Sequence, residues 1–282
     1  MKIKLFLKAS LLFFFFNGIA SGIASGIASG IASGIASGVA SGVASGVASG
    51  VASDFSFAQD AKQGMNHGDD HQQIYHAFTV EADIGEARDG KSKGLDLSGW
   101  VGGDYNRLWI NSEKKNYGKY EEKFEAQALY SRNFSQFWDA QIGASHDFST
   151  DFTAQKLSYL TIGLEGLAPQ MFETKAQVFL SEKGNYSARF KQEVDIFITQ
   201  KLITQPYFET EIFAQNAKEL EVKSGISDLE IGAETRYEIT RKFAPYFALR
   251  YHTKTFGTAD LAKQLGQRVD NFIVVAGIRL RF

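Results

Sequence analysis

Apolar and polar residues alternate along most of the chain after Tyr75, and the last segment shows the pattern most clearly. Between Phe272 and Phe282 every second residue is apolar, and the positions between them include Arg279 and Arg281. Successive side chains of a strand point to opposite faces. The segment therefore predicts a strand with one aliphatic face and one wet face, ending on an aromatic residue. This suits the wall of a membrane barrel, although the edge of a soluble β-sandwich also alternates.

The same alternation recurs upstream, and no long stretch shows helical periodicity. Further alternating segments begin near Phe78, Leu95, Phe124, Trp138, Leu160, Phe172, Tyr186, Phe208, Leu229 and Phe247. The phase breaks between Gly102 and Ile110, which indicates a turn or a bulge. The segments give eleven strands if residues 95–110 form one strand, and twelve if Gly102-Gly103 is a turn. Ten is the fallback if the segment at Tyr75 is outside the wall. Only an even count brings both ends of a barrel to one side, so we expect twelve.

The connections between these segments alternate in length. Short ones fall at residues 133–136, 168–170, 199–201 and 240–242, and long polar ones at residues 114–119, 148–156, 215–224 and 256–267. Short periplasmic turns and longer outer loops are typical of outer-membrane barrels. We predict an all-β fold, a transmembrane antiparallel up-and-down β-barrel over residues 74–282. Its amino terminus is expected in the periplasm of a Gram-negative bacterium.

Charged residues dominate the face opposite the aliphatic one. We assign seventeen acids and nine bases to that face, an excess of eight negative charges if all ionise. Unpaired charges in a dry sandwich core would cost several kcal/mol each. Against a water-filled lumen they cost little, so the charge pattern favours the barrel. A negative lumen attracts cations, although the same charges could instead pair into salt bridges that plug the barrel.

Composition narrows the function classes. The chain has no cysteine, which excludes disulfides and thiolate metal sites. A formal net charge of -2 and a pI near 6.2 do not indicate a nucleic-acid binder. Mean hydropathy is only -0.19, but barrel strands turn just half of their positions toward lipid. Thirteen per cent aromatic residues and only 3 prolines favour strands with interfacial aromatic girdles.

The first 73 residues do not show the alternating pattern. Three early lysines, an apolar run and a small-residue cleavage pattern predict a signal peptide over residues 1–58, cleaved before Gln59. It contains nine Gly-Ile/Val-Ala-Ser repeats, which could alternatively pack as a membrane helix. Residues 59–73 form a predicted flexible arm that carries Met65, His67 and His71. Such side chains bind copper or zinc, although the arm could equally be a plain linker.

Two histidines raise other possibilities. Ser145, His146 and Asp147 are strand neighbours, so they point to alternate faces and cannot converge as a hydrolytic triad. We expect no enzymatic activity. His252 falls on the inner face, where it is either a polar filler or a metal contact.

Several motifs resemble one family of outer-membrane proteins. Residues 98–109, Ser-Gly-Trp-Val-Gly-Gly-Asp-Tyr-Asn-Arg-Leu-Trp, resemble the signature of the copper resistance protein B family. Its later motifs are matched in the same order at residues 129–132, 137–139, 145–148, 166–169, 225–230, 236–239, 243–246 and 258–261. The resemblance covers about Ile74 to Phe282. It implies a barrel that handles copper ions, with a periplasmic multicopper oxidase as partner. Family members often carry a longer Met/His-rich arm than the one present here.

These observations predict an outer-membrane barrel that binds or conducts copper through an acidic lumen and contributes to copper resistance. The alternatives are a non-conducting structural or docking barrel for the oxidase, and a general cation porin. Capture of copper is assigned to Met65, His67 and His71, with His252 as a further metal contact. The cation path is assigned to Glu81, Asp83, Asp104, Asp139, Glu209, Glu211, Asp228 and Glu230.

Overall fold

The computed structural model describes residues 74–88, 90–117, 122–148, 157–217 and 220–282. The predicted signal peptide and the arm with Met65, His67 and His71 lie outside the described residues, as does most of the connection at residues 148–156.

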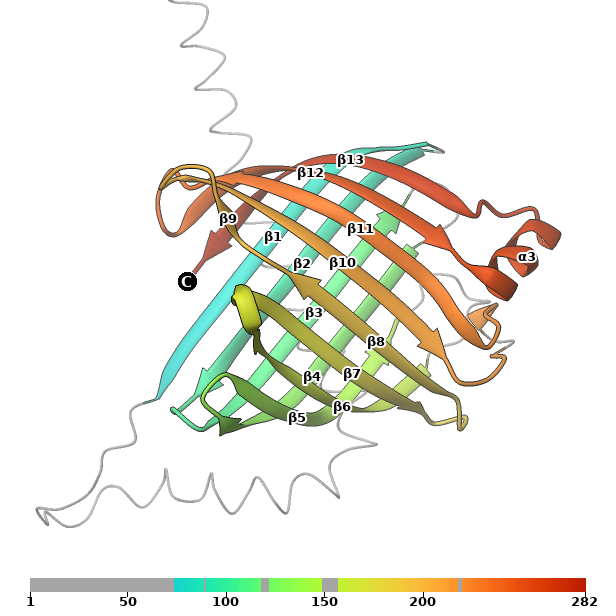
Figure 1. Cartoon of the computed structure of the whole chain (residues 1–282), viewed down its shortest axis with the longest axis horizontal. Coiled ribbons are helices and arrows are strands. Elements are labelled where there is room, and N and C mark those ends of the chain that lie inside the picture. Colours follow the sequence, from blue (N-terminus) through green and yellow to red (C-terminus); the bar gives the residue numbers. More distant parts are fainter. Residues whose placement is uncertain (1–73, 89, 118–121, 149–156, 218–219) are drawn as a thin grey trace, which may run out of the picture. The chain divides into compact units, whose positions relative to one another are not determined.

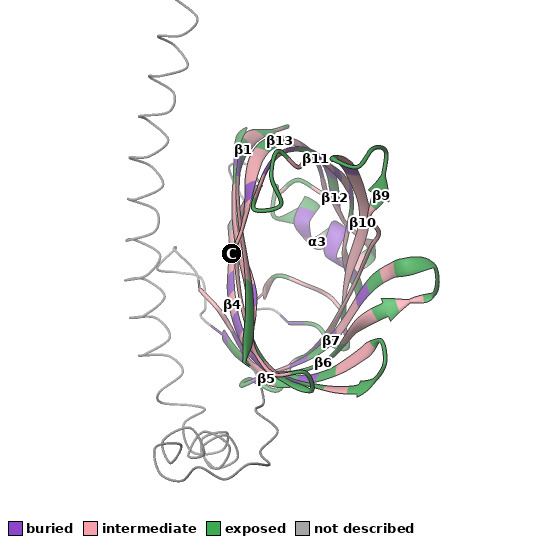
Figure 2. Ribbon diagram, turned by 90° about the vertical axis from the view of Figure 1, so that its left-hand side faces the viewer, coloured by how far each residue is buried: buried purple, intermediate pink, exposed green. Residues whose placement is uncertain are grey.

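Twelve long antiparallel strands form a closed ring, which confirms the predicted fold class. Figure 1 shows the strands from the side, and Figure 2 shows the ring after a turn of 90°. Neighbours in sequence are neighbours in the sheet, and β13 pairs with β1 to close the ring. The two-residue strand β9 (Ile196–Phe197) continues the line of β8 along β10. The twelve wall strands are β1 (Tyr75–Ala87), β2 (Gly90–Gly102), β3 (Asn106–Tyr117), β4 (Glu122–Ser135), β5 (Trp138–Asp147), β6 (Leu157–Ala168), β7 (Phe172–Ser181), β8 (Tyr186–Glu193), β10 (Leu202–Phe213), β11 (Gly225–Tyr237), β12 (Phe243–Lys254) and β13 (Asp270–Arg281).

Both ends of the ring's seam lie on the same side of the barrel. Residues 103–105 form a turn between β2 and β3, which settles the strand count at twelve. The backbones of Phe78 and Phe282 hydrogen-bond to each other, with N–O distances of 2.9 and 3.3 Å. The first and last strands therefore meet at the end that also holds the short turns. We call this the short-turn end, and the opposite one the long-loop end.

The connections at the two ends follow the prediction, with three corrections. Strand β3 continues to Tyr117, so residues 114–117 belong to the wall and not to a loop. Strand β4 continues to Ser135, which moves the next turn to residues 136–137. The long connection after β12 contains the helix α3 (Phe256–Gln264), whose Thr258, Ala259 and Ala262 are buried. Nine residues are too few to show a helical period in sequence. Pro169–Met171 form a short 3-10 helix, η2, within the turn between β6 and β7.

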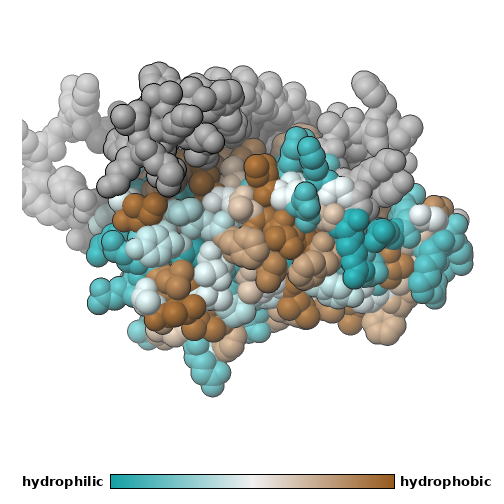
Figure 3. Space-filling view, turned by 90° about the horizontal axis from the view of Figure 1, so that it is seen from above, coloured by the Kyte–Doolittle hydropathy of each residue, from teal (hydrophilic) through white to brown (hydrophobic). Residues whose placement is uncertain are grey.

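The outer face of the barrel is apolar, as expected for a surface that meets lipid. On β6 the side chain of Ile162 is 53% exposed, whereas neighbouring Thr161 is fully buried on the inner side. Figure 3 shows one face of the molecule, where apolar side chains gather over much of the surface and hydrophilic ones toward both ends. Within the described residues, no helix combines the length and the apolar character that a membrane crossing requires.

Candidate ion path through the barrel

The register of the sheet brings five carboxylates together on the inner face. Each lies directly opposite the next across neighbouring strands β1 to β5, and we call the set the carboxylate row: Glu81, Asp96, Glu113, Glu125 and Asp147. The row runs from the middle of β1 to the last residue of β5 at the long-loop end. Like charges directly opposite each other destabilise a sheet. Such an arrangement therefore requires compensating cations.

Basic side chains compensate most of the row. Arg279 Nε bonds to Glu81 Oε1 at 2.5 Å, and Lys115 pairs with Glu113. Arg189 makes two hydrogen bonds to Glu125, of 2.9 and 3.1 Å. Three of the five acids in the row therefore have a basic side chain as partner.

A cavity of about 310 Å³ lies between the walls. Nine acidic and six basic side chains line it, so its surface is negative when all of them ionise. It includes Glu81, Asp96 and Glu113 of the carboxylate row, and Glu209 and Glu234 from the opposite wall. Because Glu234 also pairs with Arg279 at 2.9 Å, some of this charge is already neutralised.

Parts of the inner surface are apolar, which sequence alternation did not predict. Ile273 and Val275, on the inner face of β13, are almost fully buried against Tyr246 and Ala248 of β12. A second cluster joins Leu157, Tyr159 and Phe179, with Leu220 beside it. These side chains are shielded from water by each other, so they cost nothing in a partly filled lumen.

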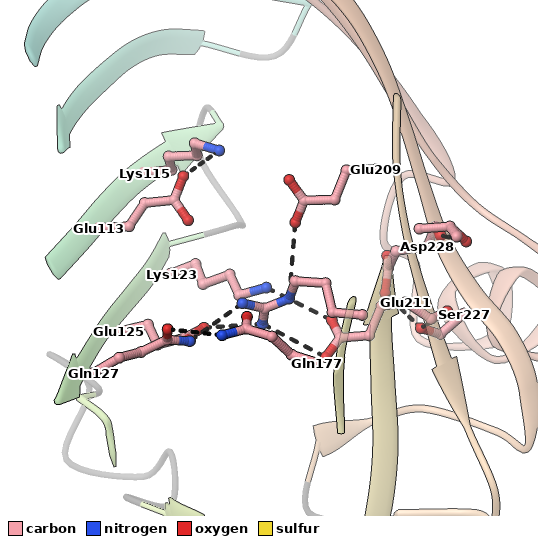
Figure 4. A network of polar contacts seen from close by, with 12 residues as sticks. Glu113, Lys115, Lys123, Glu125, Gln127, Gln177, Glu209, Glu211, Ser227 and Asp228 are labelled. Atoms are coloured by element: carbon pink, nitrogen blue, oxygen red, sulfur yellow. Dashed lines mark hydrogen bonds and ion pairs between the residues drawn. The ribbon is translucent and has the colours of Figure 1, made fainter. Parts of the chain in front are cut away.

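Contacts between non-neighbouring strands cross the lumen toward the long-loop end (Figure 4). Glu125 of β4 bonds to Arg189 of β8, although β5, β6 and β7 lie between these strands in the ring. Lys123 Nζ lies 3.6 Å from Glu211 Oε2 of β10. Gln177 of β7 donates to the Gln127 side chain of β4 at 3.3 Å. Strand β4 is therefore tied to the opposite wall by three polar contacts.

The residues assigned to the cation path fall into several groups. Glu209 and Glu211 join the Arg189 network, with ion-pair distances of 3.7 and 3.6 Å. Asp139 is near the short-turn end, where it pairs with Arg107 at 3.3 Å. Asp104 lies in the exposed turn after β2, so its assignment to the inner wall is corrected.

The structure shows interactions of three more of these acids that the sequence did not indicate. Asp83 is buried and accepts hydrogen bonds from Arg250 (2.7 Å) and Tyr246 (3.1 Å). Glu230 accepts one from Tyr207. Glu81 belongs to the carboxylate row.

His252 is buried and lies beside Asp228, with Nε2 3.3 Å from Oδ1. In the described part of the chain, no three His, Asp or Glu side chains are grouped so that they could hold a metal ion. The geometry therefore gives His252 a polar partner on the neighbouring strand. Its role as a metal contact remains a prediction.

The Ser145-His146-Asp147 stretch has its side chains on alternate faces. Ser145 bonds to Thr161 on the buried side at 2.5 Å, whereas His146 Nδ1 lies 3.0 Å from Ser158 and packs edge-on against Phe148. The three residues therefore do not converge, as predicted from strand periodicity.

Three charged lumen residues were missed in the sequence. Glu113 and Lys115 stood in or beside a predicted loop, and Arg107 in the stretch where the phase breaks. When Asp104 is taken out of the count of inner acids and Glu113 is added, the count stays at seventeen. Arg107 and Lys115 raise the number of inner bases to eleven, so the excess of negative charges falls from eight to six. Extending the strand alternation over residues 106–117 would have placed all three residues on the inner face.

Comparison with solved structures agrees with the barrel architecture. The NanC porin is similar to this chain with a TM-score of 0.51 and 11% identity, covering 71% of this chain and 98% of the porin. At that identity the likeness concerns the fold alone.

Comparison with known sequences identifies the family. A copper resistance protein B homolog of Pseudomonas syringae pv. tomato is 34% identical over 197 residues, 70% of this chain and 66% of the relative. Copper resistance protein B of Escherichia coli is 32% identical over 186 residues, 66% of this chain and 62% of the relative. The chain thus spans about two thirds of the length of these relatives. The family model of the copper resistance protein B precursor matches residues 76–282, which is the whole barrel. With its outer-membrane type of barrel, the chain belongs to the copper resistance protein B family.

Proposed function

We propose that the barrel conducts copper ions across the outer membrane through its acidic lumen, and so contributes to copper resistance. The observation that carries this proposal is the carboxylate row, which continues into a cavity with more acidic than basic side chains. Such a surface concentrates cations and repels anions. The proposal is for a transport or binding protein and not for an enzyme.

Carboxylate oxygens suit passage better than tight capture of copper. Copper prefers imidazole, thioether and thiolate ligands, and carboxylates favour harder cations. An ion that is attracted by charge but held weakly leaves its site readily, which conduction requires. The choice of copper over other cations comes from family membership, since the acids alone would attract any divalent cation.

We assign capture of copper to Met65, His67 and His71 in the arm before the barrel, where soft and borderline ligands stand close together in sequence. Because β1 begins at the short-turn end, an arm before it would deliver ions to that end of the barrel. We place this end, with both ends of the seam, in the periplasm, because short turns lie there in outer-membrane barrels.

A second candidate is a non-conducting barrel that docks a periplasmic multicopper oxidase. The contacts that cross the lumen, Glu125 to Arg189 and Lys123 to Glu211, favour this alternative because they tie opposite walls together. A general cation porin is the third.

Metal flux into liposomes separates the three. Purified full-length protein is reconstituted in both orientations, and entry of Cu, Zn and Mg is followed with metal-specific indicators. Faster entry of Cu than of Zn and Mg supports copper conduction, and equal entry of all three supports a general porin. Entry no faster than in protein-free liposomes refutes conduction and leaves the docking barrel.

A further inference from the structure

The guanidinium of Arg189 is held by three carboxylates from two sides of the lumen. It makes paired hydrogen bonds to Glu125 of β4, at 2.9 and 3.1 Å, and lies 3.7 and 3.6 Å from Glu209 and Glu211 of β10. Paired bonds from a planar guanidinium to one carboxylate fix both position and orientation. Arg189 therefore connects β4 to the β8–β10 wall.

Burial makes this ion pair stronger than the ion pair of Lys123 with Glu211, which also crosses the lumen. The side chains of Arg189 and Glu125 are 13% and 6% exposed, whereas Lys123 is 41% exposed in its pair with Glu211. Exposed pairs are screened by water and contribute little. The Arg189 side chain also lies over the ring of Phe179, 4.9 Å from its centroid, which restricts its movement. The main tie between the walls is thus the Arg189–Glu125 pair.

The position of the pair matters for anything that crosses the barrel. Arg189, Glu125 and Glu211 are each within four residues of the long-loop end of their strands, and Glu209 also lines the cavity. In Figure 4, Lys123, Glu125 and Gln127 extend from one wall toward Glu209 and Glu211 on the other. The group therefore lies toward the long-loop end of the lumen and borders the cavity through Glu209.

We infer that Arg189 is a tethered cation that closes the lumen toward the long-loop end and sets the rate at which cations pass. Its positive charge occupies the position between three carboxylates that a permeating cation would otherwise enter. The inference rests on the proposed function in that the lumen is a path for ions, but it does not depend on which ion is carried.

The test is single-channel conductance of the full-length protein in planar bilayers with KCl. Arg189→Gln and Glu125→Gln change the lumen charge in opposite directions but both remove the pair. The double variant with both substitutions removes the pair and leaves the net charge as it was. We expect a several-fold rise in conductance for the double variant and for Arg189→Gln.

Charge-matched controls come from inner-face residues outside the cavity. Lys175→Gln removes one positive charge from β7, and Glu165→Gln removes one negative charge from β6, where Glu165 bonds to Gln141 of the neighbouring strand at 2.7 Å. Neither substitution cuts a contact that crosses the lumen. The combined control variant is expected to conduct like the unchanged protein.

Three results are decisive. A charge-neutral double variant that conducts like the unchanged protein overturns the inference. The inference is also overturned if the conductance of the combined control rises as much as that of the double variant. Folding of each variant is checked by its heat-modifiable migration in gels. If Arg189→Gln does not fold, the conductance of the double variant still decides the matter. A rise in KCl conductance without copper flux supports the role of Arg189 while refuting copper conduction.

Discussion

Arg250 of β12 donates a 2.7 Å hydrogen bond to the carboxylate of Asp83 of β1, across the intervening strand β13. Tyr246 donates to the same oxygen at 3.1 Å, and the Asp83 carboxylate lies over Gly94, where a Cβ atom would approach it to 2.5 Å. A side chain at position 94 would therefore collide with the Asp83 carboxylate. The Arg250–Asp83 pair ties together the two strands that flank β13 at the seam of the ring.

Removing the Asp83 charge should destabilise the barrel strongly. The side chains of Asp83 and Arg250 are 4% and 10% exposed, so Asp83→Asn breaks a buried ion pair by removing its acidic partner. Such a loss costs about 3–5 kcal/mol. Equilibrium unfolding in urea, with the protein in liposomes, measures the change.

The matched control is Asp270→Asn, which breaks the Arg88–Asp270 pair at the long-loop end. These side chains are 56% and 42% exposed, and exposed pairs contribute about 0–1 kcal/mol. Equal losses of stability in the two variants would show that burial does not set the strength of the Asp83 pair.

The sequence predicted most of the charged residues that face inward, but not which of them meet. Alternation placed Glu81, Asp96 and Glu125 on the inner face, because a strand's period of two is a local property. Their alignment in one row depends on the register between strands, and register is set by hairpin turns and packing over the whole ring. Glu113 was hidden because a polar strand end resembles a loop.

Two other features depend on the closed barrel. Ile273 and Val275 are apolar residues on the inner face, and only the facing Tyr246 and Ala248 make them a buried cluster. The Arg189–Glu125 contact joins residues 64 positions apart on strands that are not neighbours. No spacing in the sequence indicates such a contact.

Neutralising Asp96 should stabilise the barrel while weakening its preference for cations. Asp96 lies between Glu81 and Glu113, which have Arg279 and Lys115 as partners. Relief of like-charge repulsion between opposite residues is worth about 0.2–1 kcal/mol. We expect Asp96→Asn to raise the free energy of unfolding by that amount and to lower the K⁺/Cl⁻ permeability ratio.

Glu113→Gln is the comparison variant for Asp96. It removes a charge from the same row but also breaks the ion pair between Lys115 and Glu113, so no gain in stability is expected. A stabilisation as large as that of Asp96→Asn would contradict the assignment of Lys115 to Glu113.

Copper affinity should depend on the arm more than on His252. We expect His67→Ala combined with His71→Ala to weaken copper binding by the full-length protein, because imidazoles are the ligands that copper prefers. His252→Ala should leave the affinity near its original value, since no three His, Asp or Glu side chains of the described residues are grouped so that they could hold a metal ion. Isothermal titration of the folded proteins in detergent measures both. If only His252→Ala lowered the copper affinity, the capture site would lie in the barrel and not in the arm.

The orientation of the barrel can be tested because the chain has no cysteine of its own. Single substitutions Lys183→Cys and Gln136→Cys place one thiol in an exposed turn at the long-loop end and at the short-turn end, respectively. A maleimide that cannot cross the outer membrane should label intact cells carrying Lys183→Cys and spare those carrying Gln136→Cys, because short turns face the periplasm. Both proteins should react equally after the cells are lysed, which excludes burial of either thiol. If only Gln136→Cys were labelled in intact cells, the barrel would have the opposite orientation in the membrane. The end of the lumen closed by Arg189 would then face the periplasm.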